Sequence, residues 1–262
     1  MNLFRIRGIQ LQLHFTFFLL LAVVAWDGWS DSQWPGLLWS VATILAFFTC
    51  VVLHELGHSL TAIRFGIGVR RILLMPIGGM AEFDEIPRQP RQEFLMTIAG
   101  PAVNFVIAGV LWSIFGWPEN DYPADATGFA HLLLHWNLLM GCFNLLPAFP
   151  MDGGRILRSL LATRLPYAVA TFWAATVGKI LCVLGFVAAL FVPTWLHPDE
   201  GPLYMAAVLF AFIFVAGEIE YRAAKRRERD EAHWKNVLER LHRPAPPPVV
   251  LDEPSAIVPR EG

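Results

Sequence analysis

Residues 37–63 read LLWSVATILAFFTCVVLHELGHSLTAI, an apolar run that carries two histidines and a glutamate in its second half. A helix needs about 20 predominantly apolar residues to cross a bilayer, so this stretch predicts a membrane-spanning helix. Ionisable side chains are costly inside a membrane and usually mark a functional site. His54, Glu55 and His58 are therefore the first candidate functional residues of the chain.

The composition of the whole chain is typical of a polytopic membrane protein. Of its 262 residues, 55% are hydrophobic and 16% are charged, and the mean hydropathy is +0.49. A soluble domain carries about 25% charged residues. Cys50, Cys142 and Cys182 lie singly in apolar segments, which predicts small packing residues rather than disulfides or a cysteine metal site.

Six apolar stretches are long enough to span a bilayer, and the loops between them indicate their orientation. The stretches cover residues 9–26, 36–64, 93–116, 128–163, 167–192 and 202–218. Three alternate loops, at residues 27–35, 117–126 and 193–201, hold seven acidic residues and no Lys or Arg, whereas 19 of the 20 basic residues fall on the opposite side. The positive-inside rule then predicts that both termini are cytoplasmic. We expect an all-α polytopic protein with six transmembrane helices, located in the bacterial inner membrane.

Two segments do not fit membrane spans. Within residues 66–86, the stretches 69–75 and 80–83 predict short strands, and hence a small β-hairpin or sheet after the second span; an irregular interfacial loop is the alternative. Residues 218–241 are rich in Arg, Lys and Glu and predict a helix, and the proline-rich stretch 244–259 predicts disorder. We therefore predict a transmembrane domain over residues 1–218 and a cytoplasmic segment over 219–262.

The two histidines have the spacing of a metal site. On a helix, His54 and His58 lie four residues apart on one face, so their imidazoles can bind one zinc ion. Glu55 lies between them and can accept a proton from a zinc-bound water. Zinc in hydrolases usually has three protein ligands and a water, so a third ligand is expected at the same depth.

Asp152 in the fourth predicted span is the candidate third ligand. His54 precedes Arg64 by ten residues and Asp152 precedes Arg164 by twelve. At 1.5 Å per residue, the two side chains lie about 15 Å and about 18 Å from the inner ends of their helices. An ordinary Asp-Gly turn is the alternative interpretation of Asp152 alone, but the histidines at matching depth favour a ligand.

Other polar residues at membrane depth have two interpretations each. Asn104 and Asn144 either bind a substrate carbonyl or developing oxyanion, or form hydrogen bonds between helices. Lys179 either snorkels or pairs with a carbonyl, or it lies beside the active site. A second histidine pair, His131 and His135, lacks an intervening glutamate and predicts interfacial residues rather than a metal site.

Three motifs together resemble the signatures of the site-2 protease family of intramembrane zinc metalloproteases. They are HELGH at residues 54–58, AGPAVNF at 99–105 and FNLLPAFPMDGGR at 143–155, and they occur in the family's order. The resemblance covers about residues 1–218. It implies that His54, His58 and Asp152 bind one zinc ion and that Glu55 is the general base. The two asparagines in the second and third motifs would support the site.

The resemblance also implies a substrate class. Family members cleave single-span membrane proteins such as anti-sigma factors or membrane-tethered regulators, and we expect no nucleic-acid partner. Some members carry PDZ or CBS domains, and we expect a compact form with neither. A metal transporter is one alternative, although the metal-ligand set lies at a single depth. A catalytically inactive scaffold is the other, although binding alone would not require Glu55.

Overall fold

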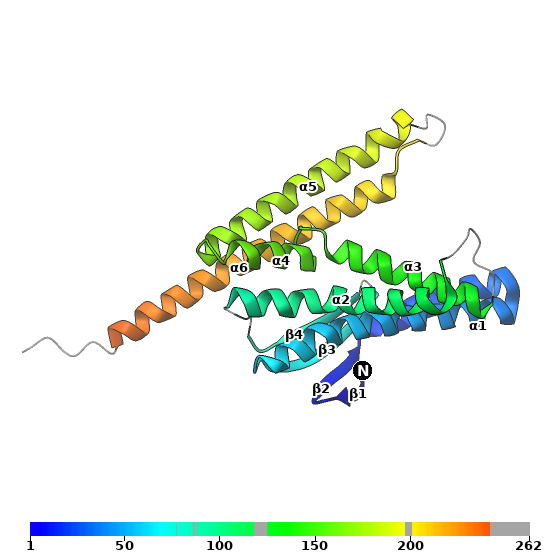
Figure 1. The fold of residues 1–262 in the computed structure, drawn as a ribbon, viewed down its shortest axis with the longest axis horizontal. Coiled ribbons are helices and arrows are strands. Elements are labelled where there is room, and N and C mark those ends of the chain that lie inside the picture. Colours follow the sequence, from blue (N-terminus) through cyan, green and yellow to red (C-terminus); the bar gives the residue numbers. More distant parts are fainter. Residues whose placement is uncertain (77, 86, 88, 118–124, 197–200, 242–262) are drawn as a thin grey trace, which may run out of the picture. The chain divides into compact units, whose positions relative to one another are not determined.

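The structure is a computed structural model that describes residues 1–262 except 77, 86, 88, 118–124, 197–200 and 242–262. The proline-rich stretch for which we predicted disorder lies outside the described residues. Two compact units are distinguished, Met1–Ala223 and a second that begins at Ala224, and the first contains every candidate site residue. Its strands are β1 (Asn2–Ile6), β2 (Ile9–Leu13), β3 (Val69–Met75) and β4 (Gly78–Phe83). The helices are α1 (Phe15–Arg64), α2 (Pro90–Phe115), α3 (Ala126–Asn144), α4 (Asp152–Leu161), α5 (Tyr167–Leu196) and α6 (Tyr204–Leu241), of which α6 continues into the second unit (Figure 1).

Helix α1 consists of two antiparallel legs joined by a sharp bend. Ser32 (φ −140°, ψ 28°) and Gln33 (φ 52°, ψ −128°) leave the helical conformation. The ring of Phe17 packs edge-on against that of Phe48, with centroids 4.7 Å apart. A straight helix would hold these two residues about 46 Å apart. The legs therefore correspond to the first and second predicted spans.

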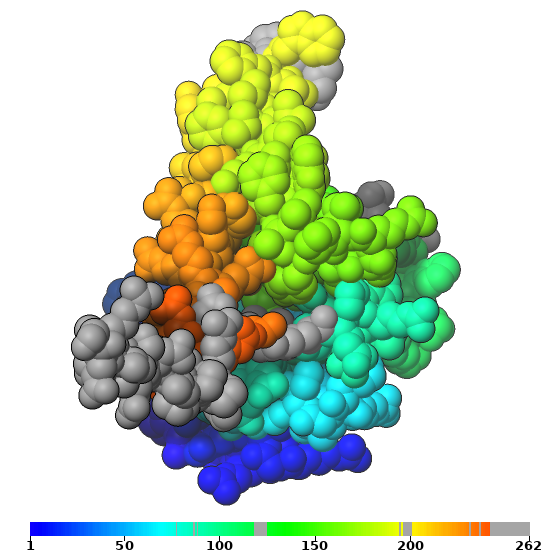
Figure 2. All heavy atoms as spheres, turned by 90° about the vertical axis from the view of Figure 1, so that its left-hand side faces the viewer, coloured from blue at the N-terminus to red at the C-terminus, as the bar shows by residue number. Residues whose placement is uncertain are grey.

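The four strands form one sheet at the base of the α1 hairpin, in the order β1-β2-β3-β4. The β1–β2 and β3–β4 pairs are antiparallel, whereas β2 and β3 pair in parallel across the whole length of α1. In Figure 2 the blue N-terminal strands and the cyan part of the chain lie at the same end of the view. Because β2 and β3 belong to one sheet, both ends of α1 lie on the same side of the membrane. The segment between them must therefore cross an even number of times, as two legs do.

The sheet confirms one prediction and corrects another. Strands β3 and β4 confirm the strands expected at residues 69–75 and 80–83. The predicted first span, residues 9–26, is wrong at its start, because β2 ends at Leu13 and α1 begins at Phe15. Apolar residues alternate with glutamines along β2. Ile9 and Leu11 are buried against β3 and α1, and Leu13 is partly buried there. This period of two is typical of a strand, and it lies directly before an apolar helix that conceals it in a search for spans.

Four of the described helices are long and apolar enough to cross a membrane, namely α1, α2, α5 and α6. The predicted fourth span, residues 128–163, is divided into α3 and α4 by an irregular segment at 145–151, as expected from the prolines at 147 and 150. Helix α2 packs against α1, α3 and α4. The chain is therefore a mostly helical, multi-pass membrane protein with a small β-sheet.

The irregular segment at residues 145–151 is covered by protein. Ala148 is buried against Cys182 of α5 and Ile213 of α6, and Phe149 is also buried. Non-helical backbone at membrane depth is tolerated only where protein or a water-filled cavity surrounds it. Helices α5 and α6 thus permit the break that places α4 and its first residue, Asp152.

Candidate metal centre

Three side chains from two distant segments converge on one point. His54 Nε2 lies 3.1 Å from His58 Nε2, and Asp152 Oδ2 lies 3.3 Å and 3.2 Å from these two nitrogens. Among the described residues, these three are the group whose ligand atoms are close enough to hold a metal ion, with all three atoms within 4.8 Å of one another. The structure therefore brings together the residues that we predicted as ligands.

The donor atoms fit a divalent cation. Asp152 Oδ2 is buried and has no hydrogen-bond partner within the described part of the chain. It faces two imidazole nitrogens that belong to residues only 4% and 8% exposed, His54 and His58. A carboxylate oxygen and two imidazole nitrogens that converge on one point are donors suited to a cation. Two histidines and one carboxylate, with a fourth position left open, are a usual ligand set of catalytic zinc.

The outer nitrogen of each imidazole is held by a hydrogen bond. His58 Nδ1 lies 2.8 Å from the backbone oxygen of Met96 in α2. His54 Nδ1 lies 2.5 Å from Asn104 Oδ1, also in α2. Since a carbonyl oxygen only accepts hydrogen bonds, these contacts favour the tautomers that carry the proton on Nδ1 and direct the Nε2 lone pairs at the cluster. Helix α2 thus fixes both rings.

Close helix packing is required behind His58. A Cβ added at Gly100 would lie 2.2 Å from His58 Nε2, so any larger residue would displace the ring. The motif therefore has a glycine at position 100 because the His58 ring approaches the backbone closely there, and not because the backbone needs an unusual conformation. Asn104, four residues later on the same helix, is fully buried and contacts the other histidine.

Glu55 lies beside the sheet. A Cβ added at Gly79 would lie 2.6 Å from Glu55 Cγ and 3.2 Å from its Oε1, so the glutamate side chain runs along the start of β4. Glu55 is partly exposed, in contrast to the buried histidines on either side. Strand β4 is the last strand of the sheet, so one of its edges is not paired within the sheet. A carboxylate, a strand edge and the ligand cluster therefore occupy neighbouring positions.

Comparison with known proteins identifies the family. The model of Peptidase family M50 matches residues 42–121 and 119–185, a range that contains the three predicted ligands and Glu55. The chain belongs to peptidase family M50. This confirms the resemblance to site-2 proteases that the three motifs indicated.

Individual M50 proteins are similar over most of this chain. Zinc metalloprotease MJ0392 of Methanocaldococcus jannaschii is 45% identical over 186 residues, which are 70% of this chain and 52% of that protein. Stage IV sporulation protein FB of Bacillus subtilis is 31% identical over 202 residues, 76% of this chain and 64% of that protein. The chain thus spans about half to two thirds of these curated relatives. The solved structure of the Site-2 Protease from Methanocaldococcus jannaschii has a TM-score of 0.57 at 36% identity, covering 84% of this chain and 94% of that one.

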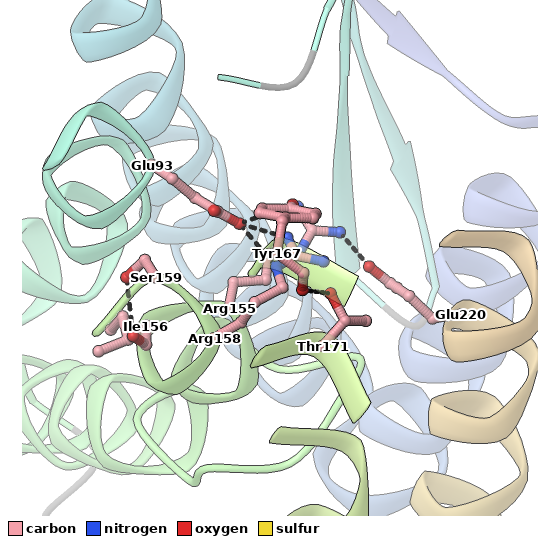
Figure 3. A network of polar contacts seen from close by, with 8 residues as sticks. All are labelled: Glu93, Arg155, Ile156, Arg158, Ser159, Tyr167, Thr171 and Glu220. Carbon is pink, nitrogen blue, oxygen red and sulfur yellow. Dashed lines mark hydrogen bonds and ion pairs between the residues drawn. The ribbon is translucent and has the colours of Figure 1, made fainter. Parts of the chain in front are cut away.

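In this M50 peptidase, one buried and one partly exposed ion pair hold the helix that carries Asp152 (Figure 3). Arg158 of α4 donates to Glu93 Oε1 of α2 through Nε, at 2.9 Å, and through Nη2, and the two side chains are 5% and 3% exposed. The Arg158 guanidinium also lies over the rings of Phe149 and Tyr167. This pair was not among the predicted site residues. A glutamate near the start of the third span and an arginine six residues after Asp152 were the available signals.

A second ion pair in the same network reaches α6. Arg155 Nη2 lies 2.7 Å from Glu220 Oε1, and Arg155 follows Asp152 by three residues, about one helical turn (Figure 3). Helix α4 of the M50 fold is thus fixed by charged contacts to α2 and to α6. Asp152 depends on these contacts because it is the first residue of that helix.

The remaining polar residues have partners outside the metal cluster. Lys179 forms an ion pair with Glu218 and lies 5.0 Å from the centroid of the Tyr221 ring. Its partner is thus a carboxylate, which differs from the carbonyl partner that was one of the interpretations left open. His131 Nε2 lies 3.2 Å from the Phe115 backbone oxygen. His135 is exposed, and neither histidine of that pair joins the metal group found in the described residues.

The two predicted supporting asparagines differ in their surroundings. Asn104 contacts His54 and a further asparagine, so it takes part in interhelical hydrogen bonding, which was the alternative interpretation. Asn144 donates to the backbone oxygen of Met140 in its own helix, at 3.0 Å. It lies at the end of α3, immediately before the irregular segment.

Proposed function

We propose that this chain is a zinc metallopeptidase that hydrolyses a peptide bond in or near the transmembrane segment of a membrane protein. The observation that carries the proposal is the buried convergence of His54 Nε2, His58 Nε2 and Asp152 Oδ2 within 3.3 Å of one another, beside Glu55. Membership of peptidase family M50 supports the same conclusion.

One zinc ion would be held by the two histidines and the aspartate. When bound, it supplies a Lewis acid that polarises a water molecule and the scissile carbonyl. The site residues provide a neutral imidazole pair and one carboxylate, which leaves net positive charge for this polarisation. The hydrogen bonds from Nδ1 of His54 and of His58 keep both rings in the orientation that binding requires.

Glu55 acts as the general base in this proposal. It accepts a proton from the attacking water and returns the proton to the leaving amine. A carboxylate that accepts hydrogen bonds can perform both steps, and Glu55 is free of the ligand cluster while remaining next to it in sequence. Asn144 would assist by donating to a substrate carbonyl or to the developing oxyanion. Asn104 would support the site through the hydrogen bond that it accepts from His54.

The substrate must be extended at the cleavage point, because a helix hides its peptide bonds. Strand β4 offers an edge at which a segment of substrate could pair as an additional strand. The Glu55 side chain lies against Gly79 of this strand, so a paired substrate would pass close to the general base. We propose a single-span membrane protein as substrate, such as an anti-sigma factor or a membrane-tethered regulator.

Orientation and location complete the proposal. We place both termini in the cytoplasm of a bacterial inner membrane, because 19 of the 20 basic residues fall on that side. The catalytic domain comprises residues 1–218 and the charged segment 219–262 follows it. Strands β1 to β4 would then lie at the cytoplasmic mouth of the site, since they flank the α1 hairpin on one side.

Glu55→Gln provides the decisive test. The amide preserves the shape of the side chain but cannot accept the water proton at neutral pH. We expect the purified variant to bind zinc in one-to-one ratio yet to leave a single-span substrate intact in proteoliposomes, and substrates to accumulate uncleaved in cells that express it. Near-normal cleavage by the variant would remove Glu55 from the mechanism, and an undiminished zinc content after loss of both histidines would refute the metal site.

A further inference from the structure

We propose that Asn137 of α3 is a positioning residue, which acts through Asn104 to fix the proton and the orientation of the His54 imidazole. This inference rests on the proposed zinc site, and it concerns a residue that touches neither the ligand cluster nor Glu55 in any described contact. It assigns to the centre of α3 a role in preparing the site for metal.

A continuous chain of hydrogen bonds leads from α3 to the cluster. Asn137 Nδ2 donates to the backbone oxygen of Leu133 at 2.8 Å, and it lies 3.2 Å from Cys50 Sγ. Asn104 Nδ2 donates to Asn137 Oδ1 at 2.9 Å. Asn104 Oδ1 in turn accepts from His54 Nδ1 at 2.5 Å. The chain joins α3, α2 and the second leg of α1.

The direction of every bond in this chain follows from its first contact. The Leu133 oxygen is a backbone carbonyl and only accepts, so the amide nitrogen of Asn137 must face it. The oxygen of Asn137 is then directed at Asn104, whose nitrogen must donate. The oxygen of Asn104 therefore faces His54 and requires a proton on Nδ1. The lone pair of His54 consequently lies on Nε2, which is the atom in the cluster.

Burial makes the alternative orientation costly. Asn104 and Asn137 are 0% and 1% exposed, so water is not available to satisfy a misplaced donor or acceptor. If either amide were reversed, two donors or two acceptors would face each other in the interior. An unsatisfied buried polar group costs about 1–3 kcal/mol, enough to keep the amides in one orientation.

Comparison with His58 shows why His54 needs the chain of hydrogen bonds through Asn104 and Asn137, which we call the relay. His58 Nδ1 is bonded directly to the backbone oxygen of Met96, which can only accept and so fixes the ring without help. A side-chain amide such as Asn104 can present either an oxygen or a nitrogen. It defines the proton on His54 only if a second group defines its own orientation, and Asn137 is in contact with it.

The test compares Asn137→Leu, Asn104→Ala and the double variant in the purified full-length protein. Leucine keeps nearly the same volume but offers Asn104 no acceptor. Zinc affinity is measured by competition with a chromophoric chelator, and the visible spectrum of the cobalt-loaded protein reports the geometry of the ligands. Outer contacts to metal-bound histidines are worth about 10–100-fold in affinity. We expect Asn137→Leu to lose about 10-fold and to alter the cobalt spectrum.

The double variant distinguishes a relay from a general packing defect. If Asn137 acts through Asn104, the double variant binds zinc as weakly as Asn104→Ala alone. Thr171→Val is the matched control, because it removes a buried hydrogen bond to the backbone oxygen of Tyr167 in α5 and should leave zinc affinity within twofold. If Asn137→Leu does not fold, Asn137→Ser replaces it, since the shorter hydroxyl does not reach Asn104.

Three outcomes separate the two proposals. Wild-type zinc affinity in Asn137→Leu, or independent losses that multiply in the double variant, would overturn the relay while leaving the proposed function intact. Failure of the wild-type protein to bind zinc at the cluster would overturn the proposed function itself. Weakened zinc binding in Asn137→Leu, together with a double variant that binds zinc as weakly as Asn104→Ala alone, supports the relay.

Discussion

The two sides of the metal centre are supported by different chemistry. Behind His54, Asn104 and Asn137 form a chain of neutral amides. Behind Asp152, helix α4 is held by the charged pairs Arg158–Glu93 and Arg155–Glu220. A histidine ligand needs one defined protonation site, which an amide chain supplies without adding charge. A carboxylate ligand at the start of a helix needs only that the helix itself be held in place. Ion pairs further along the helix can hold it. Each support therefore matches what its ligand requires.

Removal of the ligands themselves should have the largest effect on zinc binding, because neither support can act once the ligands are absent. We expect His54→Ala/His58→Ala to lose zinc completely, since Asp152 alone cannot retain the ion. Metal analysis of the purified double variant by mass spectrometry measures this. Wild-type zinc content would mean that the ion binds elsewhere and that neither support acts on a metal site.

Breaking the charged support should chiefly reduce stability. Arg158→Leu leaves Glu93 buried without its partner, and loss of one member of a buried ion pair costs about 3–5 kcal/mol. Reversible denaturation in mixed micelles would measure the change. The double variant Glu93→Gln/Arg158→Leu should recover part of the loss, because no uncompensated charge remains. Equal stability of Arg158→Leu and wild type would show that the ionic network does not hold α4.

Breaking the amide support should chiefly reduce metal affinity. Asn104→Ala removes the acceptor of His54 Nδ1, and we expect zinc affinity to fall about 10–100-fold, or about 1.4–2.7 kcal/mol. Chelator competition on the folded variant gives the value. If Asn104→Ala lost as much stability as Arg158→Leu but kept its zinc affinity, the amide support would serve stability and not metal binding, contrary to this prediction.

An exposed ion pair provides the smallest expected effect and calibrates the others. Arg70 of β3 and Asp84 form a pair whose side chains are 70% and 46% exposed. Exposed pairs contribute little because water screens them and side-chain entropy opposes them. Arg70→Gln should therefore leave both the denaturation midpoint and zinc affinity unchanged. A marked loss of either would show that charge, rather than burial, determines the importance of the ionic contacts.

The metal ligands could be predicted from the sequence because their signals are local. His54 and His58 have helical spacing, and the depth of Asp152 in its span matches theirs. Strand β3 and its partner were also predictable, from a short apolar run bounded by glycine and proline. These features depend on residues near one another in the chain, or on a simple length along a helix.

Asn104 was a predicted supporting residue, but the partners within each support could not be predicted, because they depend on which faces of two helices pack together. Nothing in the sequence near Asn137 indicates that its amide meets Asn104, which lies 33 positions earlier on another helix. Glu93 and Arg158 are separated by 65 positions. The strand β2 is a different case, since its alternating pattern was present in the sequence. The predicted first span included it, because an apolar helix follows it directly.

The parallel pairing of β2 with β3 sets an order of events during synthesis. The chain must extend by 55 residues beyond Leu13 before Val69, the first residue of β3, is made. At about 5–20 residues per second, this takes roughly 3–11 seconds. During that interval the edge of β2 that pairs with β3 lacks its partner strand. Because β3 follows α1, closure of the sheet requires both ends of α1 to lie on the same side.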